Sequence, residues 1–267
     1  MLLISFLKRF SFIVAIIFFN SGCFVYNYLH YQPRKIASQS LPISHQLFDS
    51  LLQQHVNKAG FVNYEGFIRD SVLFNNYLNL LSNHHPNTKN WDKNQRLTYW
   101  INAYNAFTIQ IICQNYPINS IKDIEKKLIN IPFGNTVWDL EFINIENQPY
   151  NLNYLEHKII RKEFDDARIH FAINCASFSC PPLLNRAYAA DLLDAQLQTQ
   201  SFAFINDTLR NKITVEKAQL SKLFLWFKKD FVRRSSLKTF INNYSAVKMA
   251  KKTPLDYLDY SWQLNKQ

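Results

Sequence analysis

The chain has 267 residues, of which 48% are apolar, 15% aromatic and 19% charged, and its formal net charge is +10. This composition suffices for one large domain or two small ones and excludes a disordered protein. With only four glycines, neither common glycine-rich phosphate-loop motif can be written, which excludes the usual nucleotide-binding loops.

The N-terminus carries a targeting pattern. Lys8 and Arg9 precede an apolar run over residues 10–19, and Ser21-Gly22-Cys23 follows. This order is typical of a secretory signal, and the cysteine after two small residues resembles the lipobox of bacterial lipoproteins. The run is the one apolar stretch near membrane-span length, so a polytopic membrane protein is excluded.

We therefore expect a signal peptide over residues 1–22, a lipidated Cys23 and a tether over 23–43. An uncleaved anchor from Phe10 to about Tyr28 is the alternative. Both readings predict an exported protein, anchored at the membrane on the periplasmic or outer face of a bacterial envelope. No nucleic-acid partner is expected for such a protein. The basic residues of the last third could face anionic lipid or simply form a solvated surface.

In the first half of the globular part, capping residues and hydrophobic spacing predict mainly helices. Helices are expected from Ser44 to about Val56, from Asp70 to Leu81, from the Asp92/Gln95 capping box to about Cys113, and over residues 121–127. Residues 61–64 read as a short extended piece, and Pro117 should end the long helix.

The second half mixes strands and helices. Strands are predicted over 138–145, 168–174 and 213–215, with a turn at Glu146-Asn147, and helices over 152–162 (capped by Asn151), 191–205, 220–231 and 236–244. No internal linker is evident, so residues 44–267 are expected to form a single, mostly helical α+β domain with a small sheet.

The segment from Arg168 to Pro182 carries the densest candidate chemistry. On a regular strand, His170 and Cys175 would lie on opposite faces, so a different histidine would be the better partner of the thiol. His157, on the preceding helix beside Glu156, is that candidate. A thiol with an imidazole neighbour and an orienting carboxylate or amide is the pattern of thiol hydrolases.

The long helix supplies two amides, Asn102 and Asn105, which lie three residues apart on one face. Asn102 or Glu156 could orient the imidazole, and Asn105, Ser177 and Ser179 could bind substrate. The two asparagines could equally serve the structure by satisfying loop backbone groups.

The cysteines also admit other readings. Cys175 could be an inert thiol, or Cys175 and Cys180 could form a disulfide, which export permits. A metal site made of His157, His170, Cys175 and Cys180 is conceivable from the ligand types, but its spacing matches no zinc module, so no metal and no cofactor is predicted. Cys113 is expected in the core.

Several segments together resemble the domain-of-unknown-function 547 family. The resemblance runs over roughly residues 44–265, through LLQQHVNKAGFVNY, YWINAYNAF, LEHKIIR, RIHFAINCASFSCPPL, LSKLFLWFKKDF and LDYSWQLN. Many bacterial members are short exported proteins or lipoproteins, which agrees with the N-terminus. The family implies a domain boundary and a location but no established activity.

Two functions remain open. The first is a lipid-anchored domain in which Cys175 is the nucleophile of a hydrolase or acyltransferase acting on an amide or ester, with His157 as the base and His170 as the second choice. The other is a non-catalytic binding or scaffold module of the cell envelope, which holds a peptide or another envelope component near Cys175.

Overall fold

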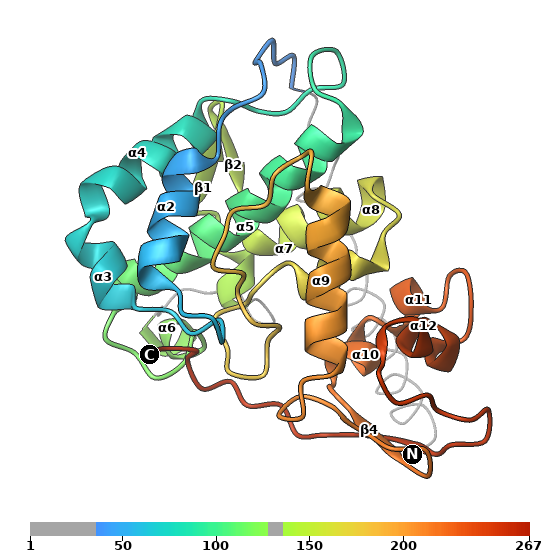
Figure 1. Ribbon diagram of the computed structural model, residues 1–267. Coiled ribbons are helices and arrows are strands. Elements are labelled where there is room, and N and C mark those ends of the chain that lie inside the picture. The colour runs from blue at the N-terminus through green and yellow to red at the C-terminus, as the bar shows by residue number, and fades with distance from the viewer. Residues whose placement is uncertain (1–35, 128–135) are drawn as a thin grey trace, which may run out of the picture. The chain divides into compact units, whose positions relative to one another are not determined.

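The helix α5 (Lys93–Asn115) runs through the middle of the domain (Figure 1). The computed structural model describes residues 36–127 and 136–267, and Ala37–Gln267 form one compact unit. Every residue from Leu97 to Ile109 is buried, as expected for a helix that other elements cover on all sides. Its predicted capping box is confirmed, since Asp92 accepts from the amide of Gln95 and the Gln95 side chain accepts from the amide of Asp92.

Other helices surround α5. The N-terminal group packs on one side of it and consists of α2 (Gln46–His55), α3 (Tyr64–Arg69) and α4 (Ser71–Ser82). The later helices are α6 (Asp123–Lys127), α9 (Leu193–Ile205), α10 (Leu223–Trp226), α11 (Lys228–Phe231) and α12 (Leu237–Tyr244). The predicted helix over 220–231 is thus two short helices, and α3 was not predicted.

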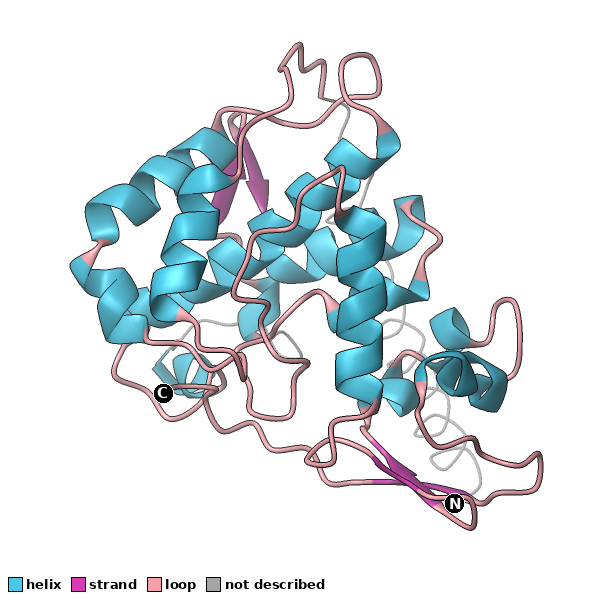
Figure 2. Cartoon of the chain, in the orientation of Figure 1, coloured by secondary structure: helices cyan, strands magenta, loops and turns pink. Residues whose placement is uncertain are grey.

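The strands form two small sheets at opposite ends of the domain (Figure 2). One is the antiparallel hairpin of β1 (Ile143–Ile145) and β2 (Gln148–Tyr150), and the predicted Glu146-Asn147 turn joins them with positive φ at both residues. The other contains β3 (Lys212–Ile213) and β4 (Ala218–Leu220) in an antiparallel pair, with β5 (Leu255–Tyr257) parallel to β4. The predicted mostly helical α+β domain is therefore confirmed.

The predicted helix over 152–162 is present, but it changes its winding. It begins as α7 (Leu152–Tyr154), continues as a π-helical stretch η2 (Leu155–Ile160) and ends as α8 (Arg161–Glu163). The predicted cap is confirmed, because the Asn151 side chain accepts from the amide of Tyr154 at 2.7 Å. π-helical turns are rare and recur at functional sites, and this one carries Glu156 and His157.

The predicted strand over 168–174 is wrong. Residues Ala167–Phe171 form the 3-10 helix η3, which packs against α9. Among the described residues, no strand lies alongside to complete a hydrogen-bonded ladder. The Asn105 side chain instead bonds the carbonyl of Ala172 at 2.9 Å and the amide of Asn174 at 2.9 Å. A side-chain amide thus takes the place of a neighbouring strand.

The predicted strand over 138–145 is also only partly present. Its first residues form the 3-10 helix η1 (Val137–Asp139), and only β1 at its end is a strand. The long helix does end just before Pro117, as predicted, with Tyr116 as its last capping residue.

The segment after β5 returns across the domain to end near α6 (Figure 1). On the way it bonds the Cys175–Cys180 loop, where the amide of Phe178 donates to the carbonyl of Gln263 at 2.7 Å. The chain terminus therefore forms part of the wall of this loop.

The predicted signal peptide, the lipidated Cys23 and most of the tether lie outside the described residues. Among the residues that are described, no helix is long and apolar enough to cross a membrane.

Candidate functional site

A cavity of about 170 Å³ brings together five of the residues singled out in the sequence. These are Glu156, His157, His170, Cys175 and Cys180. Aromatic side chains form most of the remaining wall, namely Tyr104, Trp138, Trp226, Phe227, Tyr260 and Trp262. We call this space the disulfide cavity.

The two cysteines in its wall are joined as a disulfide. The Tyr260 hydroxyl lies 3.3 Å from each of the two sulfurs, and 2.8 Å from the Ser177 hydroxyl. The amide of Cys175 also donates to the sulfur of Cys180 at 3.0 Å. The disulfide between Cys175 and Cys180, one of the alternatives predicted from the sequence, is therefore confirmed.

This bond changes the predicted chemistry. A sulfur held in a disulfide has no thiolate to offer, so Cys175 is not a resting nucleophile in this state. It also leaves neither sulfur as a metal ligand. Among residues 36–127 and 136–267, no group of three or more His, Cys, Asp or Glu side chains is placed to hold a metal ion.

His157 lines the cavity, but its hydrogen bonding does not suit the predicted base. Its Nδ1 lies 2.7 Å from the Arg161 guanidinium, which can only donate, so Nδ1 accepts and the proton of the neutral ring sits on Nε2. Burial, followed by the charge of Arg161, lowers the pKa of His157 to about 4. The Nδ1 lone pair, which a base would use to take a proton, already accepts a hydrogen bond from Arg161.

His170 is buried and is held by Asp230 rather than directed at a thiol. Its Nε2 donates to the Asp230 carboxylate at 2.8 Å, and its ring stacks on Phe227 at 4.1 Å between centroids. Burial lowers the pKa of His170 in spite of the neighbouring carboxylate. Arg161 bonds the same carboxylate at 2.6 Å. His170 therefore lines the cavity as a member of a buried polar cluster with Asp230 and Arg161.

Glu156 is the group in the cavity whose pKa is shifted close to neutral pH. Burial raises its pKa to about 7, although Arg161 and the Tyr104 hydroxyl oppose this shift. The Tyr104 hydroxyl lies 3.4 Å from Oε2. Near neutral pH such a carboxyl is available both as a hydrogen-bond donor and as an acceptor.

Asn102 and Asn105 on α5 bond the backbone of loops, which is the structural role considered for them in the sequence. Asn102 bonds both the carbonyl and the amide of Tyr188, at 2.9 and 3.0 Å. Asn105 bonds Ala172 and Asn174 in the same way. Neither lines the disulfide cavity, so Asn102 does not orient an imidazole and Asn105 does not contact the space.

Ser177 and Ser179 likewise lie outside the cavity wall. The Ser177 hydroxyl bonds that of Tyr260, and the Ser179 hydroxyl accepts from the amide of Ser261 at 2.9 Å. Both hydroxyls attach the C-terminal segment to the cysteine loop, and their role in substrate binding stays a prediction.

The sequence reasoning missed the aromatic wall. Tyr260 and Trp262 lie in the terminal LDYSWQLN segment, which was noted only as part of the family resemblance. Trp138 was assigned to a strand and Trp226 to a helix. Trp226 and Trp262 stand inside segments that carry the family resemblance, which was the available signal, but nothing in the sequence placed them beside Cys175.

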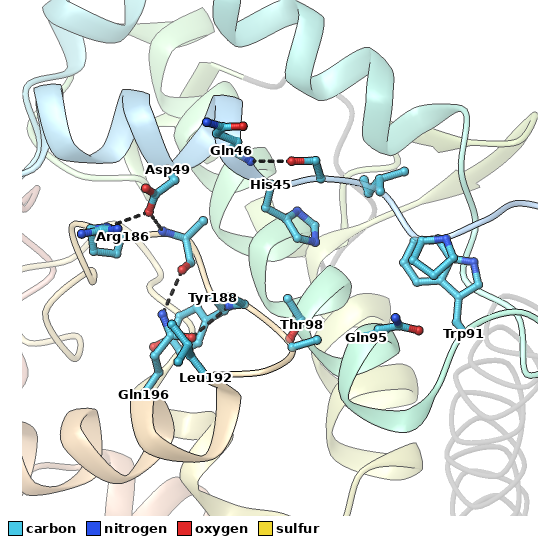
Figure 3. A pocket seen from close by; sticks show the side chains of 16 residues that line it. His45, Gln46, Asp49, Trp91, Gln95, Thr98, Arg186, Tyr188, Leu192 and Gln196 are labelled. Carbon is cyan, nitrogen blue, oxygen red and sulfur yellow. Dashed lines mark hydrogen bonds and ion pairs between the residues drawn. The ribbon is translucent and has the colours of Figure 1, made fainter.

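A second cavity, of about 570 Å³, lies between the start of α2, the start of α5 and the loop over 186–190 (Figure 3). None of the residues predicted for the site lines it. Two of its charged groups pair with each other, since Arg186 donates to Asp49 at 2.9 Å. The disulfide cavity, with its buried carboxyl and its aromatic wall, is the stronger candidate for the functional site.

The central part of the chain matches one protein-family model. Residues 88–205 match the family model described as "Protein of unknown function, DUF547". The matched part contains Glu156, His157, His170 and both cysteines, but not Trp226, Tyr260 or Trp262. The resemblance noted for residues outside 88–205 stays a prediction. No curated protein and no solved structure matches the chain.

Proposed function

We propose that the domain is a binding module of the cell envelope and that the disulfide cavity holds its ligand. The observation that carries this proposal is one buried carboxyl, Glu156, facing a small space walled by aromatic rings and a disulfide. Aromatic walls with few polar groups are typical of ligand sites. The disulfide favours binding over thiol chemistry, because it removes the free thiol.

Thermal unfolding of the full chain tests the proposal. The probes are short neutral oligosaccharides, short peptides and aromatic amines, each added in excess. At least one class should raise the Tm, because a ligand that binds only the folded state stabilises it. The increase should vanish in the variants Glu156→Ala and Trp226→Ala. A Tm that no class changes, or an increase that both variants retain, would overturn the proposal.

A second candidate is the thiol-dependent hydrolase or acyltransferase, which would require reduction of the disulfide first. It is favoured by one observation: Cys175, Glu156, His157 and His170 all line the same cavity. After treatment with a phosphine reductant, the enzyme would hydrolyse p-nitrophenyl acetate faster than the Cys175→Ala variant does. Equal rates for the two proteins would exclude this candidate.

The location in the envelope is part of the same proposal. We infer export and lipid attachment at Cys23 from the N-terminal pattern, and the disulfide supports export, since disulfides persist in oxidising compartments. Metabolic labelling with an alkyne fatty acid should mark the wild-type protein in the membrane fraction and leave a Cys23→Ala variant unmarked. Equal labelling of the two would contradict lipidation at this residue.

A further inference from the structure

Four aromatic side chains form a continuous surface in the wall of the disulfide cavity. We call it the aromatic shelf, and its members are Trp138, Trp226, Tyr260 and Trp262. The ring of Tyr260 lies 4.7 Å from that of Trp226 and 4.7 Å from that of Trp262, between centroids. Trp138 meets Trp262 at 5.4 Å. Three of the five tryptophans of the chain are therefore gathered at one cavity.

The shelf is not part of the buried core. The side chain of Trp226 is 48% exposed, and the other three members are only partly buried. Large aromatic rings that are grouped together and partly exposed to water are a feature of ligand-binding grooves and interaction sites. The shelf also combines segments from three distant parts of the sequence, and hydrogen bonds hold the last of them in place. The Tyr260 hydroxyl bonds Ser177, and the amide of Ser261 bonds Ser179.

The charges around the shelf argue against a cationic ligand. The Lys122 ammonium already lies over the ring of Trp262, at 4.0 Å from its centroid. The Arg161 guanidinium lies over Phe227 at 4.8 Å. A cationic ligand would therefore meet a like charge at the ring of Trp262 and another at the ring of Phe227. Because the pKa of Glu156 is raised to about 7, that carboxyl is also only partly ionised at neutral pH and is a weak counter-ion.

The same groups suit a neutral ligand that has an apolar face and a hydroxylated edge. The negative faces of aromatic rings attract weakly polarised C–H groups. A carboxyl near its midpoint can both donate to and accept from a hydroxyl. The cavity, at about 170 Å³, is smaller than the roughly 300–1,000 Å³ of sites for drug-sized ligands, so it accommodates about one ring rather than a whole extended molecule.

We propose that the disulfide cavity binds one ring of a neutral saccharide, with a C–H face on the aromatic shelf and a hydroxyl on Glu156. The inference rests on the proposed binding function and gives it a ligand class. Trp226, at the exposed part of the shelf, contacts the bound ring, and the rest of an oligosaccharide extends into solvent.

Titration of the full chain with soluble cellotetraose, maltotetraose and fully N-acetylated chitotetraose, monitored by tryptophan fluorescence and calorimetry, tests the inference. At least one of these sugars should bind saturably and change the tryptophan emission. The variant Trp226→Ala should weaken its binding about tenfold or more, and Trp226→Phe, which keeps a ring, should retain part of the affinity. Glu156→Ala should weaken it as well.

The matched control is Phe202→Ala, which removes an exposed aromatic side chain from α9 outside the cavity and should leave the affinity unchanged. If no sugar binds while a peptide or an amine does so in a Trp226-dependent manner, the saccharide assignment is overturned and the binding function stands. If none of the three classes binds, both fail. Thermal unfolding of each variant checks that it is folded.

Discussion

The Arg161 guanidinium lies 2.7 Å from Nδ1 of His157, one helical turn away. This contact decides the tautomer of the imidazole, because a guanidinium cannot accept a hydrogen bond. His157 lines the disulfide cavity as a neutral donor through Nε2 rather than as a base. It can therefore contribute a hydrogen bond to a ligand but not receive a proton from a thiol without losing its contact with Arg161.

Nuclear magnetic resonance of ¹⁵N-labelled histidine can check this assignment. His157 should remain neutral down to about pH 5, with its proton on Nε2, because burial and Arg161 lower its pKa to about 4. The variant Arg161→Gln should raise this pKa while leaving it below the ordinary value of 6.5, since burial is the larger cause. A wild-type His157 that titrates near 6.5 would contradict the assignment.

The disulfide predicts which cysteines react. In denatured, unreduced protein, iodoacetamide should label Cys113 and leave Cys175 and Cys180 unlabelled until a reductant is added. Mass spectrometry of tryptic peptides gives the result directly. Labelling of Cys175 without reductant would show that the bond does not form in the protein as made in cells.

Removal of the disulfide should also lower stability. The double variant Cys175→Ala/Cys180→Ala should lose roughly 2 kcal/mol of unfolding free energy, because the short loop is no longer closed in the unfolded chain. Urea denaturation measures the loss, and the reductant should have a similar effect on the wild-type protein but none on the double variant. The variant Cys113→Ala is the control that keeps the disulfide.

Glu156 makes stability depend on pH in a defined direction. Its pKa is raised from 4.5 to about 7 in the folded chain, so the unfolded state releases this proton first as the pH rises. The free energy of unfolding therefore falls between about pH 4.5 and 7. Above pH 7 the whole decrease, roughly 3 kcal/mol, is present.

The variant Glu156→Gln removes this ionisation. The unfolding free energy of this variant, relative to that of the wild type, should increase by roughly 3 kcal/mol between pH 4.5 and 8.5. Urea denaturation at each pH measures the difference. Glu216→Gln, at an exposed glutamate near β4, is the control and should show no such gain. A stability difference between Glu156→Gln and the wild type that stays constant with pH would refute the assignment.

Asn105 should stabilise the fold through its hydrogen bonds to the backbone of a loop. The variant Asn105→Ala removes two hydrogen bonds to buried backbone and should cost ~2–4 kcal/mol. Asn76→Ala, at an exposed position on α4, is the comparison and should cost well under 1 kcal/mol. An Asn105→Ala protein as stable as the Asn76→Ala protein would show that these bonds contribute little.

The helical part of the fold could be predicted from the sequence because its signals are local. The Asp92/Gln95 capping box, the Asn151 cap and the Glu146-Asn147 turn each depend on residues within a few positions of one another, and each is found where it was predicted. Gathering Glu156, His157, His170 and Cys175 as a candidate group was also within reach, since all four lie in two neighbouring segments.

Only the tertiary structure decided how these residues are used. Residues 168–174 could form a strand only beside a neighbouring strand. The Asn105 side chain, from a helix more than sixty residues earlier, bonds their backbone instead. The chemical state of His157 was set by Arg161 and that of Cys175 by Cys180. The aromatic shelf is assembled from distant segments by packing and hydrogen bonds. Such long-range contacts leave no local pattern, and so the sequence by itself identified the candidate residues but not the wall that surrounds them or the roles that they play.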